Sequence, residues 1–295
     1  MPEAMAVDAA PAAAETTPAP VDTKKTLAAA LANVDRWVGT RESRFISQAL
    51  RALSVVRQAS KANAAEAASV VKQSTAALFP ASHPLREPLL AALTPLAAGA
   101  AAATEEGAEK KKRAAAISPE SELYHALLVL LLQLDGGALE PAVGSAALAL
   151  DRLSTYNRRT LDPISEKIYF YASWAHERAG KLGELRSSLL AYHRTACLHH
   201  NAAGQAVLLN SLLRNYLHHR LLDQADKLLA KASFPDGASN CQLARFLYYS
   251  GRIKALQLEY SDAHRCLLQA TRKAPQTTGR KALGFRLAVH KLSAI

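Results

Sequence analysis

The second half of this chain carries an internal repeat of helical hairpins, and this repeat limits the possible folds more than any other pattern in the sequence. In the last copy, Gly251, Ala263 and Pro275 fall at the spacing of the tetratricopeptide pattern, and Leu267 replaces its phenylalanine. Glycine and alanine at these positions let two antiparallel helices approach closely, and proline ends the unit. Because such helix pairs cannot bury their apolar faces alone, they are expected to stack into a solenoid.

An earlier copy is found when the pattern is shifted toward the N-terminus. Ala225 stands 38 residues before Ala263, which is longer than the usual period of about 34 residues. Leu229, like Leu267, is predicted to fill the gap between successive helix pairs. Because the spacing is degenerate, the alternative that two generic helical hairpins match the tetratricopeptide pattern by chance stays open. The repeat positions assigned are Tyr216, Ala225, Leu229, Ala232, Gly251, Ala263, Leu267, Ala270 and Pro275.

Composition favours the same all-α class. Hydrophobic residues make up 49 % of the chain and aromatics only 6 %, so alanine and leucine supply most of the apolar side chains. Both are strong helix formers, and alternating runs of β-branched residues are almost absent. Ser118, Pro119 and Glu120 read as the N-cap and first turn of a helix that ends near Gly136 and Gly137.

The chain divides into four predicted segments. Residues 1–26 are rich in Ala and Pro and are expected to be disordered, because they lack large apolar groups to bury. Residues 27–80 are predicted to form an N-terminal helical segment, and residues 81–117 a Pro/Ala-rich linker carrying the basic run Lys110 to Arg113. Residues 118–295 are predicted to form the helical-repeat solenoid.

Charge and cysteine content limit the classes of partner. The chain has 36 Lys and Arg against 25 Asp and Glu, a net charge of +11. The basic residues are spread along many helices, so a nucleic-acid-binding helical-repeat protein is retained only as a less favoured alternative function.

Three unevenly spaced cysteines fit a reducing compartment. The longest apolar run, Ala126 to Leu132, is far shorter than the roughly 20 residues of a membrane span.

No constellation of catalytic or metal-binding residues emerges from the sequence. Adjacent histidines such as His199 and His200 point about 100° apart on a helix, so they make no tight metal clamp. Phosphate-binding and nucleophile-elbow motifs are missing as well. We therefore expect no enzyme activity, no cofactor, no metal and no small-molecule substrate.

Several runs of residues resemble the non-ATPase regulatory subunit 3 family of the 26S proteasome lid. The likeness covers about residues 27–60 and 118–290. The runs that carry it are Thr40 to Phe45, Asn157 to Pro163, Gly204 to Asn210, Leu213 to His218, Tyr248-Tyr249, Gly251 to Ala255 and Gln257 to Tyr260.

The resemblance implies a non-catalytic scaffold of the regulatory particle, which supports ATP-dependent degradation of ubiquitinated proteins. It implies other lid subunits as partners, no membrane contact, and location in cytoplasm and nucleus. A homologous scaffold subunit of the COP9 signalosome or of initiation factor 3 is the alternative. The resemblance further implies a C-terminal winged-helix assembly module that would follow Ile295. Without it the chain is expected to fold as an arm, expose Leu283, Leu287 and Val289, and join the lid poorly.

Overall fold

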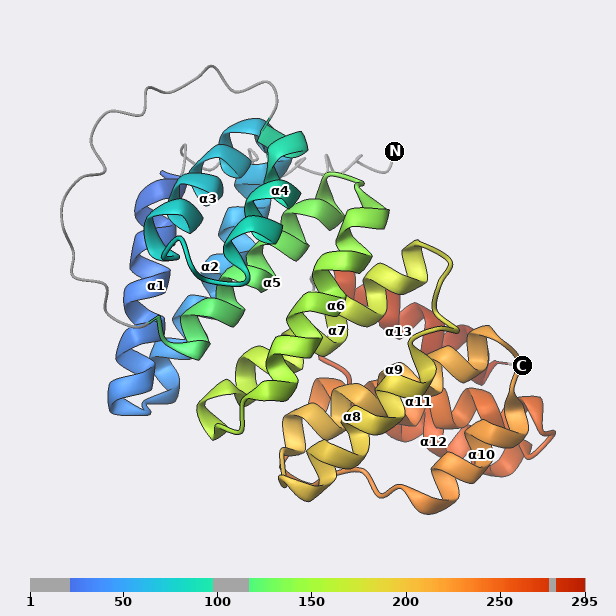
Figure 1. Cartoon of the computed structure of the whole chain (residues 1–295). Helices are drawn as coiled ribbons and strands as arrows, with labels where there is room; N and C mark the ends of the chain where they lie inside the picture. The colour runs from blue at the N-terminus through green and yellow to red at the C-terminus, as the bar shows by residue number, and fades with distance from the viewer. Residues whose placement is uncertain (1–21, 98–116, 276–279, 295) are drawn as a thin grey trace, which may run out of the picture.

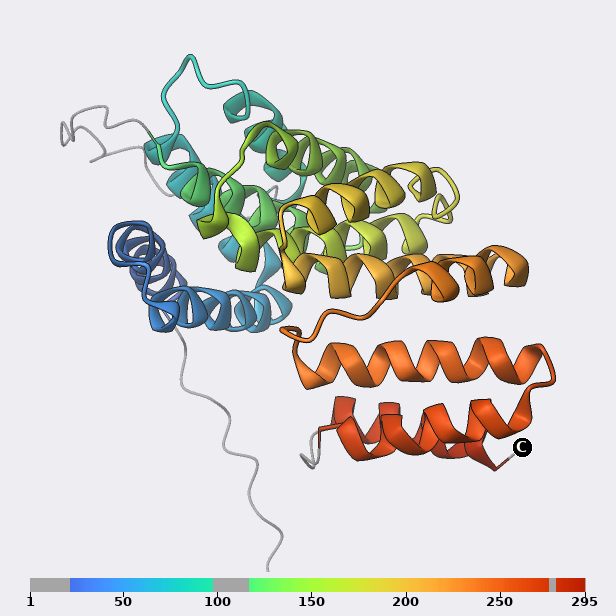
Figure 2. The same cartoon turned by 90° about the horizontal axis from the view of Figure 1, so that it is seen from below.

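The computed structural model describes residues 22–97, 117–275 and 280–294. Within these ranges the chain forms thirteen α-helices and one short 3-10 turn, with no strand. The helices form two connected parts (Figure 1). A bundle of four helices leads into a stack of helical hairpins, whose last members lie in parallel layers in Figure 2. This confirms the prediction of an all-α helical-repeat fold.

The N-terminal part comprises α1 (Thr23–Thr40), α2 (Ser43–Ala62), α3 (Ala64–Leu78) and α4 (Arg86–Ala97). Helix α1 starts earlier than predicted, because the Asp22 side chain accepts a hydrogen bond from the backbone N–H of Lys25 and so caps the first turn. The predicted disordered tail is therefore wrong for residues 23–26. Its remainder before residue 22 lies outside the described residues.

Helix α4 contradicts the linker predicted for residues 81–117. Pro88 occupies the first turn of α4, where a backbone N–H has no helical partner to lose. Leu89 and Leu93 are almost completely buried, and this burial offsets the helix-breaking tendency of Pro95. Helix α4 thus packs onto the core through Leu89 and Leu93. The basic run Lys110 to Arg113 lies outside the described residues.

Helix α5 (Pro119–Asp135) connects the two parts of the fold. Ser118 caps it by accepting from the backbone N–H of Ser121, and the chain turns away at Gly137, which has a φ of 77°. In the structure residues 120–134 are buried on every side, since α5 packs against α1 to α4 as well as α6 and α7.

The repeat part is a regular series of helices after α5. The starts of α9 and α11, at 202 and 240, differ by 38 residues, as do those of α10 and α12, at 222 and 260. Its elements are α6 Leu139–Thr155, the 3-10 turn η1 Arg159–Leu161, α7 Asp162–Arg178, α8 Arg186–Leu198, α9 Ala202–His218, α10 Leu222–Lys231, α11 Asn240–Leu256, α12 Tyr260–Lys273 and α13 Arg280–Ser293.

Helix α13 packs on the last hairpin through part of the face that the sequence analysis expected to be exposed. Val289 is fully buried in a small cluster with Leu267, so the expectation was wrong for this residue. Phe285 packs edge-on against Tyr248 with ring centroids 5.7 Å apart. Leu283 and Leu287 each remain about half exposed, at 50 % and 51 %.

Candidate protein-binding surface

The predicted repeat positions lie on two successive helix pairs, α9–α10 and α11–α12. Six of these positions face the core and have almost no exposed area. The other three lie near the ends of α10 and α12 and are half-buried. The buried positions are Tyr216, Ala225, Gly251, Ala263, Leu267 and Ala270, and the half-buried ones are Leu229, Ala232 and Pro275.

Helices α11 and α12 lie close together at Gly251. A Cβ atom placed at this glycine would lie 3.0 Å from Cγ of Leu267 and 3.2 Å from the backbone oxygen of Ala263. Both distances are shorter than an ordinary van der Waals contact. Leu267 therefore fills space within its own hairpin, and it also contacts α13 through the cluster around Val289.

Two buried asparagines of α9 connect neighbouring repeats. The Asn210 amide donates to the backbone and side-chain oxygens of Gln242 in α11, both at 3.0 Å. The Asn215 amide donates to the carbonyl oxygen of Leu182 at 2.7 Å and accepts from Nε of Arg186 in α8 at 3.0 Å. Since a buried polar group without a partner is costly, these bonds fix how the hairpins stack. Sequence reasoning missed them, although an asparagine within an apolar helix run is a usable signal.

The loop between α6 and α7 fastens the N-terminal bundle to the repeats. Trp37 of α1 donates its indole N–H to the carbonyl oxygen of Thr160 at 2.8 Å, and the Thr160 hydroxyl donates to the buried Glu120 carboxylate. On the other side, Asp162 accepts from the Asn201 amide at 2.9 Å. One short loop thereby contacts α1, α5 and the α8–α9 turn, and it joins the two parts of the fold.

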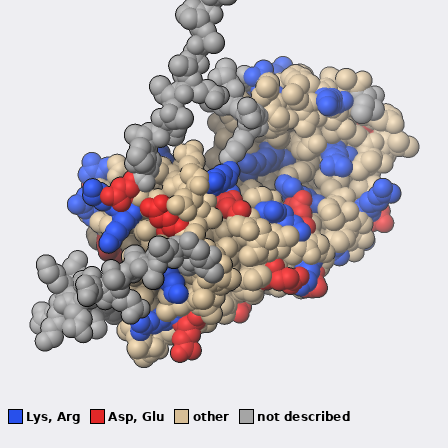
Figure 3. All heavy atoms as spheres, turned by 90° about the horizontal axis from the view of Figure 1, so that it is seen from above, with Lys and Arg blue, Asp and Glu red and all other residues tan. Residues whose placement is uncertain are grey.

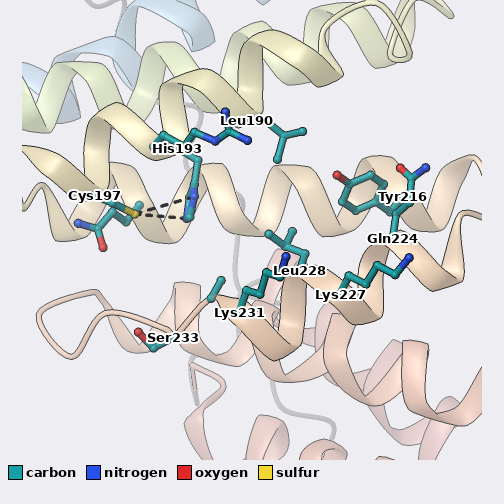
Figure 4. A pocket seen from close by; sticks show the side chains of 12 residues that line it. Leu190, His193, Cys197, Tyr216, Gln224, Lys227, Leu228, Lys231 and Ser233 are labelled. Atoms are coloured by element: carbon teal, nitrogen blue, oxygen red, sulfur yellow. Dashed lines mark hydrogen bonds between the residues drawn. The ribbon is translucent and has the colours of Figure 1, made fainter.

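A groove of about 470 Å³ opens between α8, α9 and α10. Figure 4 shows Leu190 of α8 and Leu228 of α10 directed into it from opposite sides. None of its twelve lining residues is Asp or Glu. Its three permanent cations are exposed and form no ion pair within the described part of the chain: Arg194, Lys227 and Lys231. An apolar floor with a cationic rim suits an extended polypeptide segment that carries carboxylates.

The groove also holds a Cys–His contact that is a poor candidate for catalysis. The Cys197 sulfur lies 3.9 Å from both ring nitrogens of His193 (Figure 4), a long distance for transfer of the thiol proton to the ring. Burial raises the pKa of Cys197 and lowers the pKa of His193. A nucleophilic cysteine needs a lowered pKa, so the pair lacks the electrostatics of an activated thiolate.

Charge over the rest of the surface is mixed. On the face drawn in Figure 3, Lys and Arg side chains alternate with Asp and Glu and do not form one continuous basic stripe. In the parts of the chain that the structure describes, no cluster of His, Cys, Asp and Glu is arranged to hold a metal ion. None of the described helices has the length and apolar character needed to cross a membrane.

Stacked hairpins, a small-residue helix crossing and an open groove between repeats define a tetratricopeptide-like α-solenoid. In this class extended surfaces between repeats bind other polypeptides. A family model described as "PSMD3-like, N-terminal TPR repeats" matches residues 21–295. The chain belongs to this family.

Individual relatives agree with this assignment. The chain is 42 % identical over 259 residues to a probable 26S proteasome non-ATPase regulatory subunit 3 from Drosophila melanogaster, covering 88 % of this chain and 50 % of that one. It is 48 % identical over 176 residues to the 26S proteasome non-ATPase regulatory subunit 3 of Dictyostelium discoideum, covering 60 % and 34 %. The chain thus spans half or less of the length of the curated relatives that it matches.

Proposed function

We propose that the chain acts as a non-catalytic scaffold subunit of the 26S proteasome regulatory particle and serves the degradation of ubiquitinated proteins. The match of the whole repeat region to the PSMD3-like family carries this proposal. The relatives that support it are named as non-ATPase regulatory subunits of the proteasome. The COP9 signalosome and initiation factor 3 alternatives lose support, because the matched relatives carry the proteasome name.

The proposed partners are other subunits of that particle, in particular those of its lid. The cationic groove between α8, α9 and α10 is the proposed contact for an acidic segment of one of them. The proposal includes location in cytoplasm and nucleus, which fluorescence imaging of a tagged chain would test.

Co-purification is the direct test of this function. The full chain, tagged and expressed in cells, is expected to recover proteasome subunits that mass spectrometry identifies. A double charge reversal, Lys227→Glu with Lys231→Glu, should lower this recovery, because it opposes the proposed acidic segment. A reversal of Lys24 with Lys61, which are exposed and form no ion pair in the described part of the chain, is the matched control and should leave recovery unchanged. Purification without any proteasome subunit would contradict the proposal.

A further inference from the structure

The turn between α11 and α12, residues 256–260, exposes three large apolar side chains within five residues. Leu256 is 53 % exposed, Leu258 70 % and Tyr260 58 %. Single exposed apolar residues are common on protein surfaces, but a contiguous group is a feature of interaction sites. We call residues 256–260 the apolar turn.

Leu258 also has a backbone conformation that leucine rarely adopts. Its φ is 70°, in the left-handed region, where the Cβ of an L-residue comes too close to the following carbonyl oxygen. The conformation is needed to end α11, because the Glu259 N–H donates back to the carbonyl oxygen of Lys254 at 2.9 Å. Helix ends of this pattern normally place glycine at the left-handed position.

The corresponding turns of the earlier hairpins show what this position requires for folding alone. Gly180, between α7 and α8, has a φ of 73° and carries no steric penalty. Arg220, between α9 and α10, has a φ of 56° and stands 38 residues before Leu258. The charged side chain of Arg220 is exposed, and exposure to water is favourable for a guanidinium group but not for a leucine. Leu258 is both strained and exposed, so the fold of this chain gives no reason for a leucine there.

We propose that the apolar turn is a docking site for a neighbouring protein subunit, in which Leu258 inserts into an apolar pocket between the flanking contacts of Leu256 and Tyr260. This rests on the proposed function, since the partner is taken to be another subunit of the same particle. Burial of the exposed leucine side chain in such a pocket would stabilise the complex through the hydrophobic effect.

Charge near the apolar turn further defines the partner. Arg252 lies one helical turn before Leu256 on the same face of α11, is exposed, and forms no ion pair in the described part of the chain. In contrast, the acidic residues beside the turn, Glu259 and Asp262, already pair with Lys254. The proposed pocket therefore has a carboxylate at its rim that faces Arg252.

The decisive variant is Leu258→Gly, because it separates folding from binding. Glycine relieves the left-handed strain, so the variant is expected to melt at the same temperature as the unaltered chain or higher. Its affinity for the partner should fall at least tenfold. Arg220→Gly makes the same backbone change in the equivalent turn and should bind like the unaltered chain.

Binding is measured with the immobilised full chain and individually purified subunits of the proteasome regulatory particle as probes. If the unaltered chain binds none of them, the proposed function fails. If it binds and Leu258→Gly binds equally well, the docking site alone is refuted. The docking site is also refuted if Leu258→Gly unfolds at a clearly lower temperature, or if Arg220→Gly loses binding to the same extent. Sedimentation showing that Leu258→Gly abolishes self-association of the chain would assign the turn to contact between copies and overturn a partner subunit.

Discussion

Replacing Gly251 with alanine should destabilise the protein even though alanine is the better helix former. Gly251 lies within α11, where a Gly→Ala change normally stabilises by about 1 kcal/mol. Here the new methyl group would lie 3.0 and 3.1 Å from two carbons of Leu267 and 3.2 Å from the backbone oxygen of Ala263. The leucine can move slightly, but the backbone oxygen cannot move without shifting α12.

Overpacking of this kind costs about 1 to 3 kcal/mol, and a backbone contact places the cost in the upper part of that range. After the gain in helix propensity, Gly251→Ala should lose about 1 to 2 kcal/mol of unfolding free energy. Gly144 in α6 is the matched control, because a Cβ there would meet no atom within 4 Å. Gly144→Ala should therefore stabilise by about 1 kcal/mol.

Thermal denaturation followed by far-ultraviolet circular dichroism measures both changes. For a domain of this size each kcal/mol shifts the melting temperature by about 2 to 4 °C. The two variants should thus move it in opposite directions. If Gly251→Ala raises the melting temperature as much as Gly144→Ala, then α11 and α12 are not in close contact at this glycine and the repeat register is wrong.

Three further predictions follow from buried groups. Ala263→Arg should cost roughly 3 kcal/mol or more, because a 3 % exposed alanine leaves no room for a charged chain, and a variant that melts normally would contradict this. Arg57→Ala should lower the free energy of unfolding, measured in urea, by about 2 kcal/mol. It leaves the Asp135 carboxylate, 10 % exposed, without the two 2.6 Å hydrogen bonds that it accepts from Arg57. Arg51→Ala on the exposed face of α2 should change the unfolding free energy little. Burial lowers the pKa of His125 to about 4, so between pH 7 and pH 5 the ring takes up a proton in the unfolded chain but stays neutral in the native protein. The free energy of unfolding should therefore fall by roughly 2 kcal/mol from pH 7 to pH 5. His125→Gln should lose that part of the pH dependence when unfolding is measured at both pH values.

Local sequence signals predicted the helical architecture well. Ser118, Pro119 and the glycines after α5 fixed the ends of that helix, because caps and turns act within a few residues. The spacing of 38 residues between Ala225 and Ala263 reappears as the spacing of the helices that carry them. Signals of this kind depend on the chain near each residue and need no knowledge of distant contacts.

Proline and polar residues were the places where local reasoning failed. Pro88 and Pro95 suggested a linker, but Leu89 and Leu93 bury enough apolar surface to keep α4 helical. The sequence placed Glu120 in the first turn of a helix and did not indicate that it would be buried. In the structure its side chain has no exposed area. Tertiary packing overrides local preference in these cases, because its free energy comes from contacts with distant segments.

The candidate binding surfaces depended on tertiary structure to different degrees. The sequence alone showed that the chain forms degenerate helix pairs, and runs such as Gly204 to Asn210 indicated the family before any geometry was known. It could not assemble the groove, because Arg194, Lys227 and Lys231 converge only when α8 and α10 are stacked against α9. Nor could it single out Leu258, since the strain at this residue is a property of its φ angle and its exposure a property of the packed surface. Helical period and caps are encoded locally, whereas a surface is made by residues that only folding brings together.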